Sequence, residues 1–368
     1  MMVSLDEQEV IQSAVREFSE SELKPLASKI DSDAMIPAEL FQKLASIGIF
    51  GITCTQQYGG AGTSFETMMR VVSELGRVSA SVALTCLNHN LACSILNDFG
   101  SEQQKSLLHE LASCRKIAAV TVPQNLSSNP AKISYTLHND EYILNGTKQY
   151  VVNGSFADVC ITICGSNADV EFLIVEKGTE GFVQNTQIGL LGVRASGITH
   201  IQFHNVKTLQ DRTIGTKEDA PKILQLLQEG IWLGLSSIAL GIAKASLDAA
   251  VKYANQRVQF GKPIAKFEAI QEMISNIAND IQSTSALLDR IFRMKDHGKT
   301  KLNDCVTAKI IATSAAAKSA IFALKIHGGY GFIRDYPVER FVRDAKAIEI
   351  LGGRNSDLRK ITARKVLG

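Results

Sequence analysis

The spacing of apolar residues changes twice along this chain, and that order limits the folds open to it. From residue 7 to about residue 116, apolar residues recur three and four positions apart, as in residues 39–44, the spacing that lines one helix face. From residue 117 to about residue 215 the spacing falls to two, as in residues 159–164, which is typical of strands. Helical spacing then returns and continues almost to the end of the chain.

We therefore predict three domains: helical over 1–116, β over 117–215 and helical over 216–368. The middle domain should hold seven or eight short antiparallel strands. The last should be a bundle of long amphipathic helices, with the alanine-rich stretch 313–323 packed on every side. This order excludes a fold of alternating strands and helices. No GxGxxG stands at a strand-to-helix turn, so a nucleotide would have to be held in another way.

Composition excludes several classes of partner. The 39 basic and 37 acidic residues give a net charge of +2, too small a field to favour nucleic acid or an anionic membrane. The first nine residues turn acidic at once and do not resemble a secretory signal, and no apolar stretch reaches the ~18 residues that span a bilayer. The seven cysteines form no CxxC pair, so we predict no metal site. We expect a cytoplasmic protein.

Six short motifs follow one another in a fixed order along the chain. They are Tyr-Gly-Gly-Ala-Gly at 58–62, Val-Thr-Val-Pro at 120–123, Leu-Asn-Gly-Thr-Lys at 144–148 with Asn-Gly at 153–154, Arg-Val-Gln-Phe-Gly-Lys-Pro-Ile at 257–264, Gly-Gly-Tyr-Gly at 328–331 leading to Tyr-Pro-Val-Glu-Arg at 336–340, and Arg-Asp-Ala-Lys at 343–346. Over essentially its full length the chain resembles the acyl-CoA dehydrogenase family of flavoproteins. The resemblance implies an N-terminal helical domain, an antiparallel, barrel-like β-domain and a C-terminal four-helix bundle.

The resemblance also implies FAD, bound between the β-domain and the bundle. Its adenine end would be completed by a neighbouring subunit, which implies a homodimer or homotetramer. Arg257 would reach the pyrophosphate, because a guanidinium suits phosphate oxygens, and Gly328 and Gly329 would let backbone approach the adenosine half. The cofactor-binding residues carried over from the motifs are Thr121, Ser127, Tyr150, Val151, Val152, Arg257, Phe260, Lys325, Gly328, Gly329, Arg354 and Ser356. The sequence does not identify the electron acceptor.

Two motifs depart from the family pattern at the flavin ring. The family's Leu-Thr-Glu-Pro is Val-Thr-Val-Pro here, which keeps Thr121 as a hydrogen-bonding group for the pyrimidine edge. The family's Trp-Ile-Thr-Asn is Tyr-Val-Val-Asn at 150–153. Tyr150 can still stack on the isoalloxazine, but Val152 cannot supply the hydroxyl that the family's threonine points at N5. We expect flavin binding to survive, with altered tuning of the reactive nitrogen.

The general base of the family reaction has no counterpart at either of its usual positions. A carboxylate normally takes the α-proton of an acyl thioester while the β-hydride passes to flavin N5. In most members it is a glutamate nine residues after the arginine of Arg-Asp-Ala-Lys, and here that position is Gly352. In others the base directly precedes an arginine on an earlier helix. Here the position of that base is Ile231 and the position of that arginine is Trp232. Glu349 and Glu229 are the nearest substitutes.

Gly352 retains its backbone N–H. In the family this group and a flavin ribityl hydroxyl bind the thioester oxygen, which needs no side chain. We expect an FAD-dependent oxidoreductase that acts on an acyl thioester by an atypical mechanism. Because Trp232 and the loop 124–127 depart from the family's coenzyme A contacts, the thioester could be carried by coenzyme A or by a carrier protein. Two alternatives stay open: a flavoprotein that catalyses a non-redox elimination on a thioester, and a catalytically silent flavin- or acyl-binding paralogue.

Overall fold

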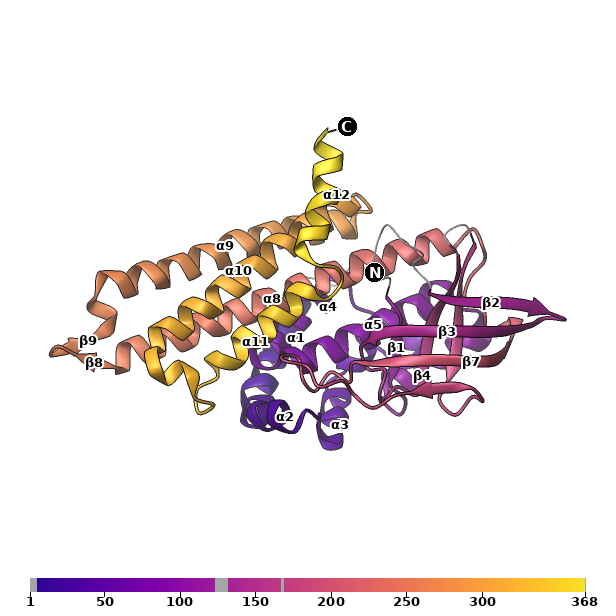
Figure 1. Ribbon diagram of the computed structural model, residues 1–368, viewed down its shortest axis with the longest axis horizontal. Helices are drawn as coiled ribbons and strands as arrows, with labels where there is room; N and C mark the ends of the chain where they lie inside the picture. The colour runs from indigo at the N-terminus through magenta and orange to yellow at the C-terminus, as the bar shows by residue number, and fades with distance from the viewer. Residues whose placement is uncertain (1–4, 123–131, 167–168, 368) are drawn as a thin grey trace.

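The computed structural model describes residues 5–122, 132–166 and 169–367, and the chain begins with a helical domain (Figure 1). Its helices are α1 (Leu5–Phe18), α2 (Ala27–Asp33), α3 (Ala38–Ser46), α4 (Phe65–Val78), α5 (Ala80–Phe99), α6 (Glu102–Lys105) and α7 (Leu108–Ala112). Serines begin the two helices that form its core. Ser64 Oγ accepts from the Thr67 N–H at 3.2 Å and Ser79 Oγ from the Val82 N–H at 3.4 Å. Each serine therefore satisfies a donor that the first helical turn leaves unpaired.

The middle domain contains two sheets. Its strands are β1 (Ala118–Val120), β2 (Ile133–His138), β3 (Glu141–Val151), β4 (Val159–Ser166), β5 (Asp169–Glu176), β6 (Phe182–Gln184) and β7 (Thr199–Leu209). One sheet has the order β1-β4-β5 and the other β2-β3-β7-β6. The strand-block prediction is confirmed, with one correction: β1 and β4 run parallel. The chain leaves β1 for two strands of the other sheet before it returns to β4, and a long crossover of this kind permits parallel pairing.

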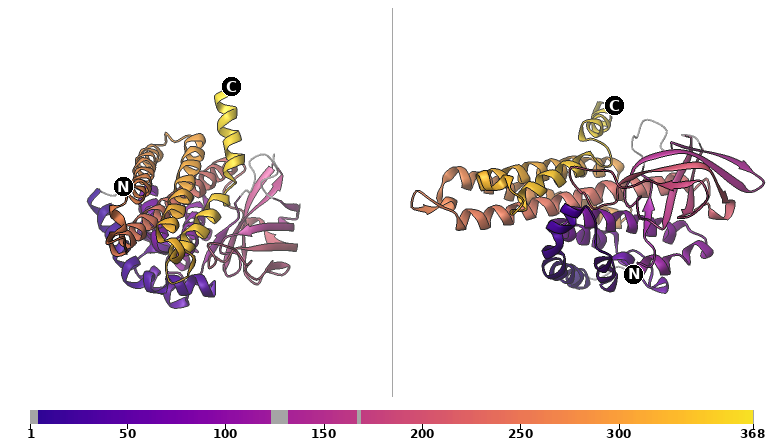
Figure 2. Two further views of the ribbon diagram at one scale, coloured as in Figure 1. Left: turned by 60° about the vertical axis from the view of Figure 1, so that its left-hand side comes forward. Right: turned by 60° about the horizontal axis from the view of Figure 1, so that its bottom comes forward.

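The C-terminal domain is a four-helix bundle with one further helix. It contains α8 (Ala220–Gln256), the short strands β8 (Val258–Gln259) and β9 (Lys262–Pro263), α9 (Glu268–Asp296), α10 (Leu302–His327), α11 (Val338–Ile350) and α12 (Asn355–Leu367). Helices α8 to α11 pack against one another, while α12 projects away from the bundle (Figures 1 and 2). The β8–β9 hairpin lies at the end of the bundle farthest from the β-domain (Figure 1).

Helix α8 is the central element, because it packs on α4 and α5 of the first domain and on α9, α10 and α11 of the bundle. The helices α4 and α8 approach each other so closely that there is no room for side chains at their crossing. A Cβ atom added to Gly241 would lie 2.3 Å from the Ser73 carbonyl oxygen and 2.7 Å from the Arg77 nitrogen. Glycine at position 241 therefore fixes the separation of the two helical layers.

The apolar character of the bundle corrects two expectations. By length and composition, α8 and the stretch Leu302–Phe332 could each cross a membrane, although the sequence led us to expect no such stretch. In α8, 89% of the apolar window is buried inside the fold, so these side chains serve the packing of a core helix. The second correction concerns residues 313–323 of α10, which we predicted to be packed on every side. Ile321 in this stretch is 44% exposed, and Ile311 just before it is 41% exposed.

Gly241→Ala should weaken the packing of α4 against α8, and with it the contact between the first domain and the bundle. The added methyl would force backbone to move, and overpacking of this kind costs about 1–3 kcal/mol in the free energy of unfolding. Gly189→Ala is the matched control, because a Cβ atom there meets no atom within 4 Å. Urea unfolding followed by circular dichroism at one fixed protein concentration measures both. Equal stability of the two variants would contradict the close approach.

Candidate active site

A cavity of about 670 Å³ lies where the β-domain meets α8 and α11. Its lining is mostly apolar, with a few polar groups, as is usual for a ligand site. The lining residues are Leu84, Asn88, Val120, Val122, Tyr150, Val152, Leu190, Leu191, Gly192, Val193, Ile198, Ile231, Arg343, Lys346, Ala347, Ile350, Leu351, Gly352, Gly353, Arg354 and Asp357. The structure thus brings together four of the residues predicted for the cofactor or the oxyanion: Tyr150, Val152, Gly352 and Arg354.

The end of β3 presents two of the three flavin-strand residues to this cavity. The pairing of β3 with β7 shifts register between Lys148 and Val151, and Tyr150 takes a positive φ of 55° within that irregularity. Its ring is half-exposed and lies edge-on to His200 at 5.1 Å. Val152 lines the cavity, whereas Val151 is buried in the core of the β-domain. Val151 can therefore contact a ligand through backbone atoms only.

Thr121 lies beneath the cavity, between two valines that line it. Its side chain is fully buried, and its hydroxyl oxygen accepts a hydrogen bond from the Ile163 N–H at 2.8 Å. The hydroxyl proton remains available, because a hydroxyl can accept and donate at once. Ser127, also predicted to contact the cofactor, lies outside the described residues, as does the loop 124–127.

Gly352 occupies a turn that is tied to α8 by a tryptophan. The Trp232 Nε1–H donates to the Gly352 carbonyl oxygen at 2.7 Å. The glycine has a φ of +66°, and an added Cβ atom would lie 2.8 Å from Leu235 Cδ1 and 3.4 Å from Trp232 Cδ1. The direction in which a side chain at position 352 would project is therefore filled by α8. The sequence identified Trp232 only as a missing arginine and gave no sign of this hydrogen bond.

The two backbone polar groups of Gly352, which belong to successive peptide units, differ in their partners. The carbonyl accepts from the indole, whereas the N–H donates to no acceptor within the described part of the chain. A backbone N–H on the wall of an apolar cavity can stabilise negative charge that develops on a ligand oxygen. This geometry is compatible with the oxyanion role predicted for Gly352.

The carboxylates suggested as substitute bases do not line the cavity. Glu229 is buried and held by Lys295 and by Gln225 Nε2, the latter at 2.8 Å. Glu349 pairs with Lys346 at 2.9 Å. Among the described lining residues, Asp357 is the single carboxylate, and it accepts from Arg354 Nε at 2.9 Å and from Lys360 Nζ at 3.1 Å. The residues outside the described ranges include no Asp or Glu.

The Arg-Asp-Ala-Lys motif holds the opposite wall in place, a role that the sequence did not indicate. Asp344 is buried and accepts from the Val193 N–H at 2.7 Å, and Arg343 donates to the Leu191 carbonyl at 2.9 Å. Arg343 also forms an ion pair with Asp31 at 2.6 Å. One short motif on α11 thus connects the cavity wall to the N-terminal domain.

A second group of predicted residues lies at the far end of the bundle. Arg257, Gly328 and Gly329 line a cavity of about 530 Å³ together with Tyr253. Phe260 lies in the nearby hairpin and is 92% exposed. Lys325 is also exposed at this end of the bundle. Arg354 and Ser356 are exposed at the start of α12, away from this group, and Arg354 lines the first cavity. The predicted cofactor residues therefore form two separate sets.

The length of α8 gives the separation of these two sets. Ile231 lines the first cavity and Tyr253 the second. They are 22 residues apart on one helix, which corresponds to about 33 Å at a rise of about 1.5 Å per residue. This distance exceeds the length of an extended FAD molecule, so the two sets of one chain cannot contact the same FAD.

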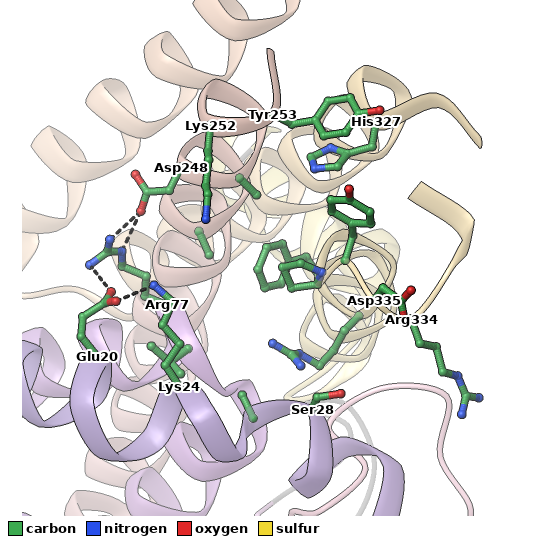
Figure 3. A pocket seen from close by; sticks show the side chains of 18 of the residues that line it. Glu20, Lys24, Ser28, Arg77, Asp248, Lys252, Tyr253, His327, Arg334 and Asp335 are labelled. Carbon is green, nitrogen blue, oxygen red and sulfur yellow. Dashed lines mark hydrogen bonds and ion pairs between the residues drawn. The ribbon is translucent and has the colours of Figure 1, made fainter. Parts of the chain in front are cut away.

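A third cavity, of about 630 Å³, lies between the first domain and the bundle, and none of the predicted site residues lines it (Figure 3). Arg77 bridges two carboxylates in it, Asp248 at 2.6 Å and Glu20 at 3.4 Å. Tyr253 and His327 stack at 4.2 Å on its edge, and both also line the second cavity.

Comparison with known proteins gives matches along almost the whole chain. Models for the N-terminal, middle and C-terminal domains of acyl-CoA dehydrogenase match residues 5–115, 118–206 and 233–367. An acyl-CoA dehydrogenase of Bacillus subtilis (strain 168) is 32% identical and covers 98% of both chains. An acryloyl-CoA reductase (NADH) of Anaerotignum propionicum is also 32% identical, over 98% of this chain and 94% of that protein.

Solved structures agree with these sequence matches. Butyryl-CoA dehydrogenase from Megasphaera elsdenii superimposes with a TM-score of 0.92 at 30% identity, over 100% of both chains. The similarity therefore extends to the arrangement of all three domains.

Asp344→Asn should change how stability depends on pH. Burial raises the pKa of Asp344 to about 6, from 3.8. Between these values the folded protein holds a proton that the unfolded chain has released, so this group's stabilisation is present at low pH and is lost as the pH rises through 6. Asparagine keeps an oxygen acceptor for the Val193 N–H and does not ionise, so it avoids the cost of a buried negative charge above pH 6.

The stability of Asp344→Asn relative to wild type should therefore rise by about 2 kcal/mol between pH 4 and pH 7, since each pKa unit is worth about 1.4 kcal/mol and the unfolded carboxyl is already partly ionised at pH 4. Denaturant unfolding of both proteins at several pH values measures the difference. A difference that does not change with pH would show that the carboxyl has an ordinary pKa.

Proposed function

The chain belongs to the acyl-CoA dehydrogenase family, and we propose that it is an FAD-dependent oxidoreductase that acts on an acyl thioester without a carboxylate base of its own. The observation that carries the proposal is the Gly352 peptide. Its N–H is free within the described chain, while α8 fills the space that a side chain at this position would use. This geometry supports the proposal that the oxyanion function is retained and that the base is absent.

The residues present fit FAD, which the members of this family bind. The apolar surface formed by Val120, Val122 and Val152 suits a flat ring system. At the far cavity, an added Cβ atom at Gly328 or Gly329 would meet no atom within 4 Å, so the backbone there is open to a phosphate or sugar. Arg257 lies beside these glycines and supplies a guanidinium for the pyrophosphate.

FAD, when bound, supplies the acceptor for the hydride that leaves the β-carbon of the acyl group. The Gly352 N–H would hold the thioester oxygen as negative charge develops on it, and Trp232 binds the carbonyl of the same residue, in the next peptide unit of the turn. No carboxylate of the cavity is free to take the α-proton, which would leave to water or to a basic group of the substrate. A general base contributes about 10²- to 10⁴-fold to a rate, so we expect slow turnover of ordinary saturated thioesters.

Two further observations support a shared cofactor site and therefore an oligomer. The two sets of predicted FAD residues are too far apart in one chain to hold the same molecule. Each FAD would then contact the flavin set of one copy and the Arg257 set of another. In addition, Phe260, Ile311 and Ile321 are exposed in a single chain, and a neighbouring copy would remove apolar surface from water.

Anaerobic mixing with acyl thioesters tests the proposed activity. The panel pairs each acyl group on coenzyme A with the same group on a carrier protein. Loss of the oxidised-flavin absorbance together with an unsaturated product is the expected result, and the member of each pair that reacts identifies the carrier. Product without any bleaching would favour elimination, and neither bleaching nor a spectral shift would favour a silent paralogue.

Restoring the carboxylate tests the register of Gly352. Glutamate at this position would have an unfavourable positive φ, at a cost of roughly 1–2 kcal/mol, and would approach Leu235 too closely. We therefore place Gly352→Glu in a Leu235→Ala background and compare it with Gly352→Gln in the same background. The glutamate variant should bleach the flavin at least about 10-fold faster, since only glutamate can take the proton. Equal rates with substrate bound would show that position 352 does not face the α-carbon.

Subunit complementation tests the shared cofactor site. Arg257→Glu removes the phosphate ligand at one end of the bundle, and Val152→Phe fills the flavin side at the other. Each variant alone should be purified without flavin. Mixed oligomers isolated with two different tags should regain about half of the wild-type flavin content, because one site of each pair is built from two intact halves. Mixed oligomers without flavin would show that both sets act on the FAD of their own chain.

A further inference from the structure

A lysine is buried beneath the turn that carries Gly352. Lys309, on α10, is fully buried. Its Nζ donates to the Glu349 carbonyl at 2.6 Å, to the Gly353 carbonyl at 2.7 Å and to Asn355 Oδ1 at 2.9 Å. An ammonium has three N–H donors, so this group is fully satisfied. Its acceptors lie at the end of α11, in the turn, and at the start of α12.

The acceptors of this lysine are neutral, although a buried cation is usually paired with a carboxylate. The Glu349 side chain turns instead to Lys346. The Glu349 carbonyl belongs to the last turn of α11, where carbonyls lack partners within the helix and where a cation is favoured by the helix dipole. Burial lowers the pKa of Lys309 to about 8, so the three-donor ammonium form still predominates at pH 7.

Asn355 is held in place by the same helix that carries the lysine. Its Nδ2 donates to Thr313 Oγ1 at 3.0 Å, and Thr313 Oγ1 donates to the Lys309 carbonyl at 2.7 Å. All the polar side chains of this group are thus fixed relative to α10. Only the 351–354 turn spans the space between α11 and α12 without regular structure of its own, so the lysine constrains the part of the site with the least internal support.

We propose that Lys309 is a positioning residue, which fixes the turn around Gly352 so that its N–H is held on the cavity wall. Trp232 holds the Gly352 carbonyl from α8, and Lys309 holds the flanking carbonyls from α10. The turn is thus fixed before and after the Gly352 N–H by hydrogen bonds from two helices. The effect on substrate rests on the proposed function, whereas the effect on the turn does not.

The test compares Lys309→Met with Lys318→Met in the flavin-loaded, full-length protein. Methionine is unbranched and of similar length, so it fills the space without donating. Lys318 is a matched control on the same helix, because it is partly exposed and pairs with Asp280 at 3.0 Å. Hydrogen exchange followed by mass spectrometry should become at least about 10-fold faster at the hydrogen-bonded amides that flank the turn, those of Leu351, Asp357 and Leu358, in Lys309→Met and stay unchanged in Lys318→Met.

Fluorescence gives a second readout, because Trp232 is the single tryptophan of the chain. Acrylamide should quench its emission more strongly in Lys309→Met than in the control, since the Gly352 carbonyl that holds the indole has become mobile. The thioester-induced shift of the flavin spectrum should require at least about 10-fold more thioester, with the flavin content unchanged.

Unchanged exchange and quenching in a folded Lys309→Met protein would overturn the proposal and leave the lysine a role in packing alone. If Lys309→Met does not fold, Asn355→Ala replaces it, since this variant removes one of the three acceptors. It should give a smaller increase in exchange at the same amides, and no increase would equally overturn the proposal. A loosened turn in a protein whose wild type never responds to thioesters would instead count against the proposed function.

Discussion

The burial of α8 between two layers of helices is the constraint on which the rest of the structure depends. At Gly241 the helix meets α4 with no side chain between them, and on its other side it packs on α10. Because packed interiors deform little, α8 acts as a rigid spacer. One end contributes to the cavity beside the β-domain and the other to the cavity near Arg257, so both sites are placed by the same helix.

The walls of the first cavity are held in place by side chains that form hydrogen bonds with backbone groups. Trp232 holds the Gly352 carbonyl, Lys309 holds two neighbouring carbonyls, and Asp344 accepts from the opposite wall. The carboxylates near this site are all engaged with cations. Among the described residues, the cavity therefore presents an unpaired backbone N–H and no unpaired carboxylate, as the proposed function requires.

The sequence predicted the order of helical and β domains, because periodicity distinguishes helix from strand. The absence of the base at Gly352 stays a prediction, which rests on a count of nine residues from Arg343. The indole that fills the space beside Gly352, the burial of Lys309 and the parallel pairing of β1 with β4 were not predicted, because each joins segments far apart in the chain. The exposed face of α10 was missed for a related reason: alanine-rich composition indicates close packing without saying which chain supplies the partner.

The proposed sharing of one FAD between two copies has a consequence for how the protein would behave in dilute solution. A cofactor that bridges copies stabilises the assembly by mass action, and the assembly in turn retains the cofactor. Dilution below the dissociation constant of the oligomer should therefore release FAD as the subunits separate. The amount of protein made in a cell would then determine how much of it is active, even when free FAD is abundant.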